Sequence, residues 1–206
     1  MALMLTWALG IGRYGGADEP AHVLRAAAVA NGELIGESAP AGADLAGGYR
    51  VVSVPAELAS GDPACFRHSA DATSACASPS SGDGWVRAAT SAGINPPLYY
   101  AIVGVPVRVF GDTSEVFWYR AAAASLNGVV LLMVARRLRP FGRSAGVALL
   151  AFTPAAWFLI GVVNPNGFEF VLALLAWVGV ARWKRDRWPA RAWWIAAPLA
   201  VAVACR

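Results

Sequence analysis

The stretch RSAGVALLAFTPAAWFLIGVVNPNGFE, residues 143–169, decides the fold of this chain. It carries no charged side chain between Arg143 and Glu169. Residues 144–163 would form a helix about 30 Å long, which matches the hydrocarbon thickness of a bilayer. The sequence therefore predicts a membrane-spanning helix at this position.

Basic residues flank this region in two groups. The first group precedes it: Arg136, Arg137, Arg139 and Arg143. The second follows the next apolar run: Arg182, Lys184, Arg185, Arg187 and Arg191. Short loops rich in Arg and Lys remain on the cytoplasmic side of a membrane. We therefore expect both groups inside and the uncharged turn 164–167 outside.

The composition agrees with a membrane protein. Hydrophobic residues make up 57% of the chain and charged residues only 15%, whereas soluble proteins carry roughly 25% charged residues. The formal net charge of +4 is explained by the two inside loops, so nucleic acid is not an expected partner. The expected partner is the lipid bilayer, and the expected location is a bacterial cell membrane.

Working back from the basic loops gives the order of the segments. Residues 1–12 form a partial transmembrane helix of about 18 Å, too short to cross alone. Residues 13–116 form a long extracytoplasmic loop, and 117–206 hold the remaining transmembrane helices. These are expected at 117–135, 144–163, 167–181 and 192–205. Because both ends fall in incomplete apolar runs, we expect a piece of a longer protein.

The outer loop contains two expected helices and a short strand. A helix is expected at about 20–32, with an acidic residue and Pro20 at its start, and a strand at 49–55. The apolar stretch 97–110 reaches only about 21 Å. A true span there would invert the later helices or the first segment, so an interfacial or re-entrant helix is expected.

Cys65 and Cys76 both fall in this loop. An extracytoplasmic compartment permits a disulfide between them, and the alternative is two free thiols. Their spacing does not fit a paired-CxxC zinc site.

The densest group of reactive side chains is Asp18, Glu19, His22 and Arg25. The two carboxylates could supply a catalytic base or bind a divalent metal ion, the one cofactor that the sequence suggests. The His and Arg could orient a substrate. The alternative is ordinary capping, since an acidic residue before a proline is common at a helix start.

Further polar residues lie at the ends of apolar segments. Asn95 and Tyr99 open the segment 97–110, where a helix cap is the alternative. Arg120 lies near the outer end of a span, where it could contact a phosphate or simply reach the interface. The last set is Asn164, Asn166 and Glu169: turn chemistry explains the asparagines, but an acid in an apolar helix is a candidate site residue.

Several of these motifs also resemble known families. Pro-Pro-Leu-Tyr-Tyr (96–100), Val-Phe-Gly (109–111), Arg120, Arg-Arg (136–137) and Gly-Arg-Ser-Ala-Gly (142–146) are similar to the amino-terminal half of GT-C membrane glycosyltransferases. More closely, the motifs at 18–22, 95–100 and 164–167 resemble a bacterial family of predicted multi-pass membrane proteins of unknown function, grouped with that superfamily. The resemblance covers nearly the whole chain.

The resemblance implies a transferase that uses a polyprenyl-phosphate-linked sugar at the outer membrane face. Asp18 or Glu19 would be the base, with a divalent metal ion in some members, and Arg120 would contact the donor phosphate. The later helices and the carboxy-terminal outer domain of a complete enzyme are absent from this sequence.

The fold class expected is therefore all-α: a polytopic transmembrane helix bundle with a GT-C-like amino-terminal module and a long extracytoplasmic first loop. The rival function is a non-catalytic membrane protein of cell-envelope assembly or partner binding. A transporter is less favoured, because no pair of charges lies at the middle of the predicted spans.

Overall fold

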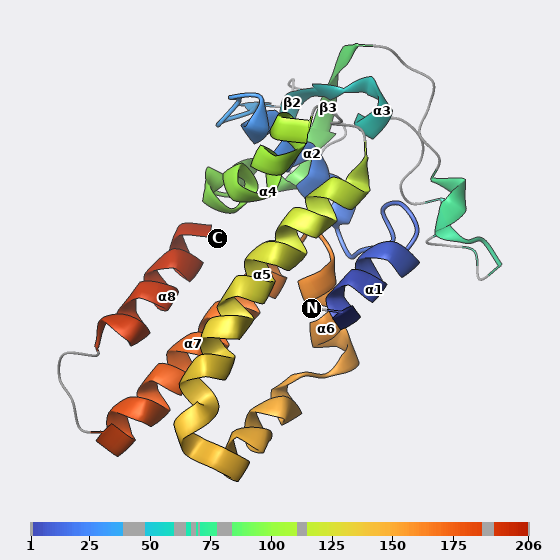
Figure 1. The fold of residues 1–206 in the computed structure, drawn as a ribbon. Helices are drawn as coiled ribbons and strands as arrows, with labels where there is room; N and C mark the ends of the chain where they lie inside the picture. Colours follow the sequence, from blue (N-terminus) through green and yellow to red (C-terminus); the bar gives the residue numbers. More distant parts are fainter. Residues whose placement is uncertain are drawn as a thin grey trace.

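The computed structural model of the chain describes residues 2–38, 48–59, 65–66, 69, 71–77, 84–110, 115–186 and 192–205. The protein is mostly helical, with a small three-stranded sheet. The long helix α5, Val116–Leu138, runs through the middle of the molecule. The small sheet and the short helices near it lie around the beginning of α5, at the top of Figure 1, and α7 runs alongside α5.

One helical stretch of the described residues, Val116–Val147, is long and apolar enough to cross a membrane by length and composition. The helices α6 (Pro154–Gly161) and α7 (Pro165–Asp186) meet at a bend of 117° and could form a second, broken span or a re-entrant loop. The helix α8, Trp193–Cys205, is apolar but shorter. The structure thus offers one or two candidate spans, fewer than the four expected beyond residue 117.

The largest difference from the sequence prediction lies at 144–163, where one continuous helix was expected. The chain instead forms a 3₁₀ segment, η3 (Arg139–Ala151), and then the short α6. Pro154 disfavours helical backbone at Thr153, which has a ψ of 161°. The Thr153 side chain then accepts a hydrogen bond from the Ala156 N–H and starts a new helix.

The sheet corrects the expected all-α class. The strands β1 (Glu37–Ser38), β2 (Arg50–Pro55) and β3 (Trp85–Thr90) are antiparallel in the order β1-β2-β3. In β2 alternate valines, Val52 and Val54, are fully buried, as expected for a strand with one face on a core. Only β2 was expected from the sequence, one residue longer at its start.

The sheet packs beside α2 (Glu19–Ala30), and α2 packs against α4 (Pro97–Phe110). Small apolar residues on α2 let these elements approach closely, and the buried set includes Val23, Ala26, Ala27 and Ala28. Three short helical turns also belong to the segment between α2 and α4: α3 (Ala56–Ala59), η1 (Ser74–Cys76) and η2 (Ser91–Ile94). The helix α4 covers the residues expected to be helical, while its place at the membrane interface stays a prediction.

The first helix, α1 (Ala2–Gly10), packs against both α5 and α6. Asn127 of α5 is fully buried, and its amide donates a 2.8 Å hydrogen bond to the carbonyl of Ile160. That carbonyl is in the last turn of α6, where a helix leaves its carbonyls without partners. Asn127 therefore fixes the end of α6 against the long helix.

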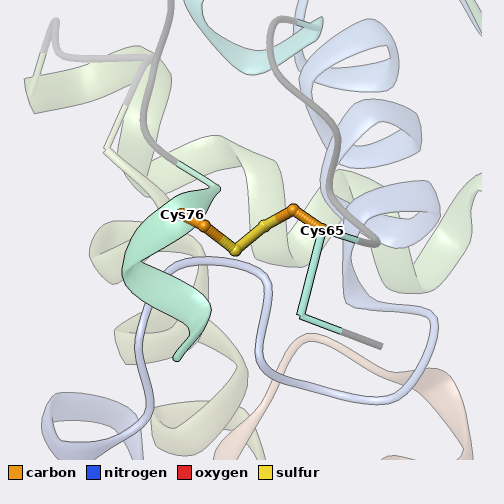
Figure 2. Close-up of a disulfide and its surroundings, with 2 residues drawn as sticks. All are labelled: Cys65 and Cys76. Carbon is orange, nitrogen blue, oxygen red and sulfur yellow. A yellow bond between two sulfur atoms is a disulfide. The ribbon is translucent and has the colours of Figure 1, made fainter. Parts of the chain in front are cut away.

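Cys65 and Cys76 are joined by a disulfide, with their Cα atoms 6.2 Å apart (Figure 2). The bond ties the η1 turn to the preceding part of the outer segment. A disulfide of this kind is typical of an oxidising compartment.

Candidate functional site

A tight turn between α1 and α2 sets the positions of the two adjacent carboxylates. Tyr14 and Asp18 both have left-handed backbone, with φ of 59° and 54°. Aspartate is one of the few residues that adopt this region with little strain. Asp18 precedes α2 but makes no side-chain cap, and it is exposed, whereas Glu19 is fully buried. The turn therefore separates two neighbouring acids into different environments.

Glu19 accepts four hydrogen bonds. Its Oε1 accepts from Arg120 Nε at 2.8 Å and from the Val163 N–H at 3.2 Å. Its Oε2 accepts from Arg120 Nη2 at 2.6 Å and from the Gly16 N–H at 3.2 Å. A Cβ at Gly16 would lie 3.0 Å from the Glu19 side chain, so the approach requires glycine. The carboxylate is fully engaged in holding the fold.

Arg120 is equally saturated. Besides Glu19, its guanidinium donates to the carbonyls of Ala8 (3.1 Å), Ile11 (2.6 Å) and Gly12 (2.8 Å). An arginine has five N–H donors, and these five bonds use all of them. Ala8 is in the last turn of α1, where carbonyls lack helical partners, and Ile11 and Gly12 directly follow the helix. Arg120 is thus a clasp between α1, α2 and α5, with no donor left for the donor phosphate that the sequence suggested.

The expected metal site at Asp18 and Glu19 does not fit this geometry. Both Glu19 oxygens are engaged by N–H donors inside the protein, whereas Asp18 is exposed. The described residues hold no group of three or more His, Cys, Asp or Glu side chains placed to bind a metal ion. A divalent cation would have to displace Arg120 to reach Glu19.

Asp18 instead lines a polar pocket of about 290 Å³. The pocket lies between α2, η2, the start of α7 and the end of α8. Its lining residues are Asp18, His22, Ser91, Ala92, Asn95, Pro165, Asn166, Glu169 and Cys205. Five of these were candidates from the sequence, and the first and last of them, Asp18 and Glu169, are 151 positions apart. The Asp18 carboxylate makes no hydrogen bond within the described residues, so its oxygens are available to a ligand.

His22 lines the pocket and is hydrogen-bonded to Tyr100 of helix α4. Its Nδ1 lies 2.9 Å from the Tyr100 hydroxyl, and that hydroxyl accepts a 2.8 Å hydrogen bond from the Asn95 amide. Burial lowers the pKa of His22 from 6.5 to about 4, although the Asp18 and Glu19 carboxylates act in the opposite direction. His22 is therefore neutral at physiological pH.

The remaining candidates lie behind the pocket. Arg25 is buried and donates from Nη2 to the carbonyls of Leu34 and Asn95, at 2.7 and 3.0 Å. Tyr99 is fully buried, with its ring 5.9 Å from that of Phe168. These two side chains do not line the pocket; they are buried behind the residues that do.

Asn164 caps α7. Its Oδ1 accepts from the Asn166 N–H at 2.9 Å, and its amide donates to the Ala17 carbonyl at 3.0 Å. This is the capping geometry expected of asparagine before a helix with proline in its first position. Asn164 thereby ties the α6–α7 break to the turn that carries Asp18.

The family of the chain follows from a comparison with family models. The model described as "Predicted membrane protein (DUF2142)" matches residues 1–205. The chain belongs to this family. No curated protein and no solved structure shows significant similarity to it.

Membership of the DUF2142 family and the apolar α5 agree that this is a membrane protein. Sequence reasoning missed Ser91 and Cys205, which line the pocket of this DUF2142 protein, and the buried Tyr100, which contacts His22. Tyr100 was next to a chosen tyrosine, but nothing in the sequence distinguished the two. Cys205 belongs to α8, and only tertiary packing brings it beside α2.

Proposed function

We propose that this membrane protein transfers a sugar from a polyprenyl-phosphate-linked donor to a hydroxyl acceptor, with Asp18 as the general base. One observation carries the proposal: of two adjacent carboxylates, Glu19 is bonded to four N–H donors, while Asp18 is exposed in a polar pocket. The division provides a fixed scaffold next to an available base. The resemblance to GT-C transferases supports the same assignment.

The reaction suits the groups that line the pocket. The acceptor oxygen would attack the anomeric carbon of the sugar, and the bond from that carbon to the phosphate oxygen would break. The acceptor proton would pass to Asp18, and the lipid phosphate would leave as an anion. Because the leaving group is already a stable anion, catalysis depends mainly on positioning. His22, Asn95, Asn166 and Glu169 are placed to orient the hydroxyl groups of a sugar.

The arrangement of charges supports an outer-face site in a multi-pass protein. The helix α2 and the end of α8, which carry lining residues of the pocket, lie in the upper half of Figure 1. Arg136 and Arg137 are in the last turn of α5, at its lower end, and Arg139 and Arg143 follow it. The end of α7, whose last turns contain Arg182 and Lys184, lies toward that same lower end of the molecule. With basic loops inside, the pocket would face outward, where lipid-linked sugars could reach it.

The test is the variant Asp18→Asn, which keeps the side-chain shape and suits left-handed backbone. Membranes that contain the full chain would be supplied with synthetic polyprenyl-phosphate-linked sugars, and transfer to a hydroxyl acceptor would be measured. We expect a loss of at least roughly a hundredfold, the usual contribution of a general base.

Asp71→Asn is the matched control, because Asp71 is also an exposed aspartate of the outer segment but does not line the pocket. It should transfer sugar like the unaltered chain. Equal activity of Asp18→Asn and Asp71→Asn, or no transfer by the unaltered chain with any donor, would refute the proposed function.

One observation favours a second candidate function, the binding of a partner protein. The strand β3 lies at the edge of the sheet, and its Trp85 and Val86 are 50% and 39% exposed. An exposed edge strand with apolar side chains can pair with a strand of another chain. Loss of binding partners in a Trp85→Lys variant, with sugar transfer unaffected, would support this role in addition.

A further inference from the structure

His22 and Asn95, which both line the pocket, are linked through the hydroxyl of the buried Tyr100. The proton of each hydrogen bond in this short chain can be assigned to a donor. The Asn95 amide donates to the Tyr100 hydroxyl at 2.8 Å, and the hydroxyl lies 2.9 Å from His22 Nδ1. The hydroxyl proton has one acceptor within reach in the described part of the protein, which is His22 Nδ1. Tyr100 is fully buried, so water does not compete for that proton.

If Nδ1 accepts, the single proton of the neutral ring must be on Nε2. Nε2 makes no hydrogen bond with any described residue, and His22 lines the pocket. The ring edge that carries Nε2 is therefore the edge that a ligand meets. His22 is poised to donate a hydrogen bond rather than to accept one.

We propose that Asn95 and Tyr100 are positioning residues that hold His22 as an Nε2–H donor to an oxygen atom of a neutral, hydroxyl-bearing ligand. The naming of a sugar as that ligand rests on the proposed function. The orientation of His22 does not, because it follows from the hydrogen bonds alone.

The charges around His22 favour a neutral ligand. Asp18 and Glu169 line the pocket as carboxylates, and no Lys or Arg is among its lining residues. Glu19, the first residue of α2, is paired with Arg120, and Arg25 is directed to the carbonyls of Leu34 and Asn95. Two carboxylates repel an anion but accept hydrogen bonds from hydroxyl groups. The phosphate of a lipid-linked donor would then bind outside this pocket.

The tautomer can be measured directly in the full chain. Protein labelled with ¹⁵N-histidine would be studied by NMR in micelles at about pH 7, where His22 is neutral. The variant His22→Gln assigns the signals of His22 against those of His68. We expect protonated Nε2 and unprotonated Nδ1. A protonated Nδ1 in the unaltered chain would mean that the hydrogen-bond chain runs in the opposite direction, and the proposal would fail.

The role of Tyr100 is tested by Tyr100→Phe, with Tyr14→Phe as the matched control. Tyr14 is also a buried tyrosine, but its hydroxyl donates to the Leu58 carbonyl at 2.6 Å and does not contact His22. Tyr100→Phe should produce a mixture of the two His22 tautomers, whereas Tyr14→Phe should leave the Nε2–H form. An unchanged tautomer in a folded Tyr100→Phe variant would remove the positioning role.

The ligand class is tested by titrating a panel of methyl glycosides and, separately, inorganic phosphate. We expect at least one glycoside to shift the His22 Nε2 signal at a concentration about tenfold below that needed for phosphate. Stronger binding of phosphate, or no shift with any glycoside, would refute the neutral-ligand assignment. Because these measurements do not depend on turnover, they distinguish a failure of this inference from a failure of sugar transfer.

Discussion

At the scale of single residues, the structure brings together some of the side chains that the sequence singled out, and it gives neighbouring ones different surroundings. The sequence singled out Asp18, Glu19 and Arg120; in the structure Glu19 and Arg120 form a buried ion pair, and Asp18 is exposed in the pocket. The sequence could not show that Glu19 pairs with Arg120, because the two are 101 positions apart. The left-handed backbone of Asp18 was equally hidden, since it depends on how the turn packs against α6 and α7.

Removing one partner of the buried ion pair should destabilise the protein strongly. Arg120→Met would leave the fully buried Glu19 carboxylate without its main partner, at a cost of about 3–5 kcal/mol. The exposed pair Arg87–Glu37, with side chains 47% and 73% accessible, provides the control. Arg87→Met should cost less than about 1 kcal/mol. Thermal unfolding in micelles compares the two variants, and equal losses would contradict the clasp.

His22 should make stability depend on pH. Its folded pKa of about 4 lies below its ordinary value of 6.5, so the unfolded chain binds the proton first as pH falls. Stability is therefore full above about pH 6.5 and is lost progressively toward pH 4, by about 3 kcal/mol in total. The difference between the unaltered chain and His22→Gln, measured by urea unfolding across this range, isolates the contribution. A parallel pH dependence of both proteins would contradict it.

At the scale of elements, the helices formed by long periodic or apolar runs were predictable from the sequence, whereas the breaks between helices were not. Residues 97–110 and the core of α5 lie where the apolar pattern indicated. The region 144–163 shows why hydropathy alone misleads. Thr153 and Pro154 together carry a stop and a start signal, but an apolar average over 20 residues conceals them.

The sharp bend between α6 and α7 depends on Gly167. A Cβ at this position would lie 2.2 Å from the Leu159 carbonyl oxygen, a backbone atom that cannot easily move. Gly167→Ala should therefore destabilise by about 1–3 kcal/mol. At Gly10 a Cβ would meet nothing within 4 Å, so Gly10→Ala should be neutral or slightly stabilising. Thermal unfolding of both variants checks this, and a neutral Gly167→Ala would show that the bend relaxes.

At the scale of the whole molecule, the charge pattern of the sequence separates two ends. In the structure, η1 and α2 lie toward the beginning of α5, and Arg139 and Arg143 follow its end. The sheet was not predictable as a unit, because β1 has only two residues and β3 pairs across a long connection. Such pairing is set by tertiary contacts rather than by local preference.

Sidedness can be tested with thiol chemistry in intact cells. After reduction, Cys76, which is exposed, should react with a membrane-impermeant maleimide. A cysteine introduced by Arg143→Cys in a Cys65→Ser/Cys76→Ser chain should react only after the cells are opened. Arg143 is exposed as well, so accessibility within the fold is matched. The reverse pattern of labelling would invert the proposed orientation.

The clasp formed by Arg120 also sets an order of events during synthesis. At roughly 5–20 residues per second, Arg120 emerges from the ribosome on the order of ten seconds after Glu19. Throughout that interval the carboxylate and the carbonyls of α1 must remain solvated, so the amino-terminal hundred residues cannot reach their final packing. Biogenesis therefore includes a waiting stage in which the nascent chain is open to insertion factors and proteases, and it ends when α5 has emerged and Arg120 can reach Glu19.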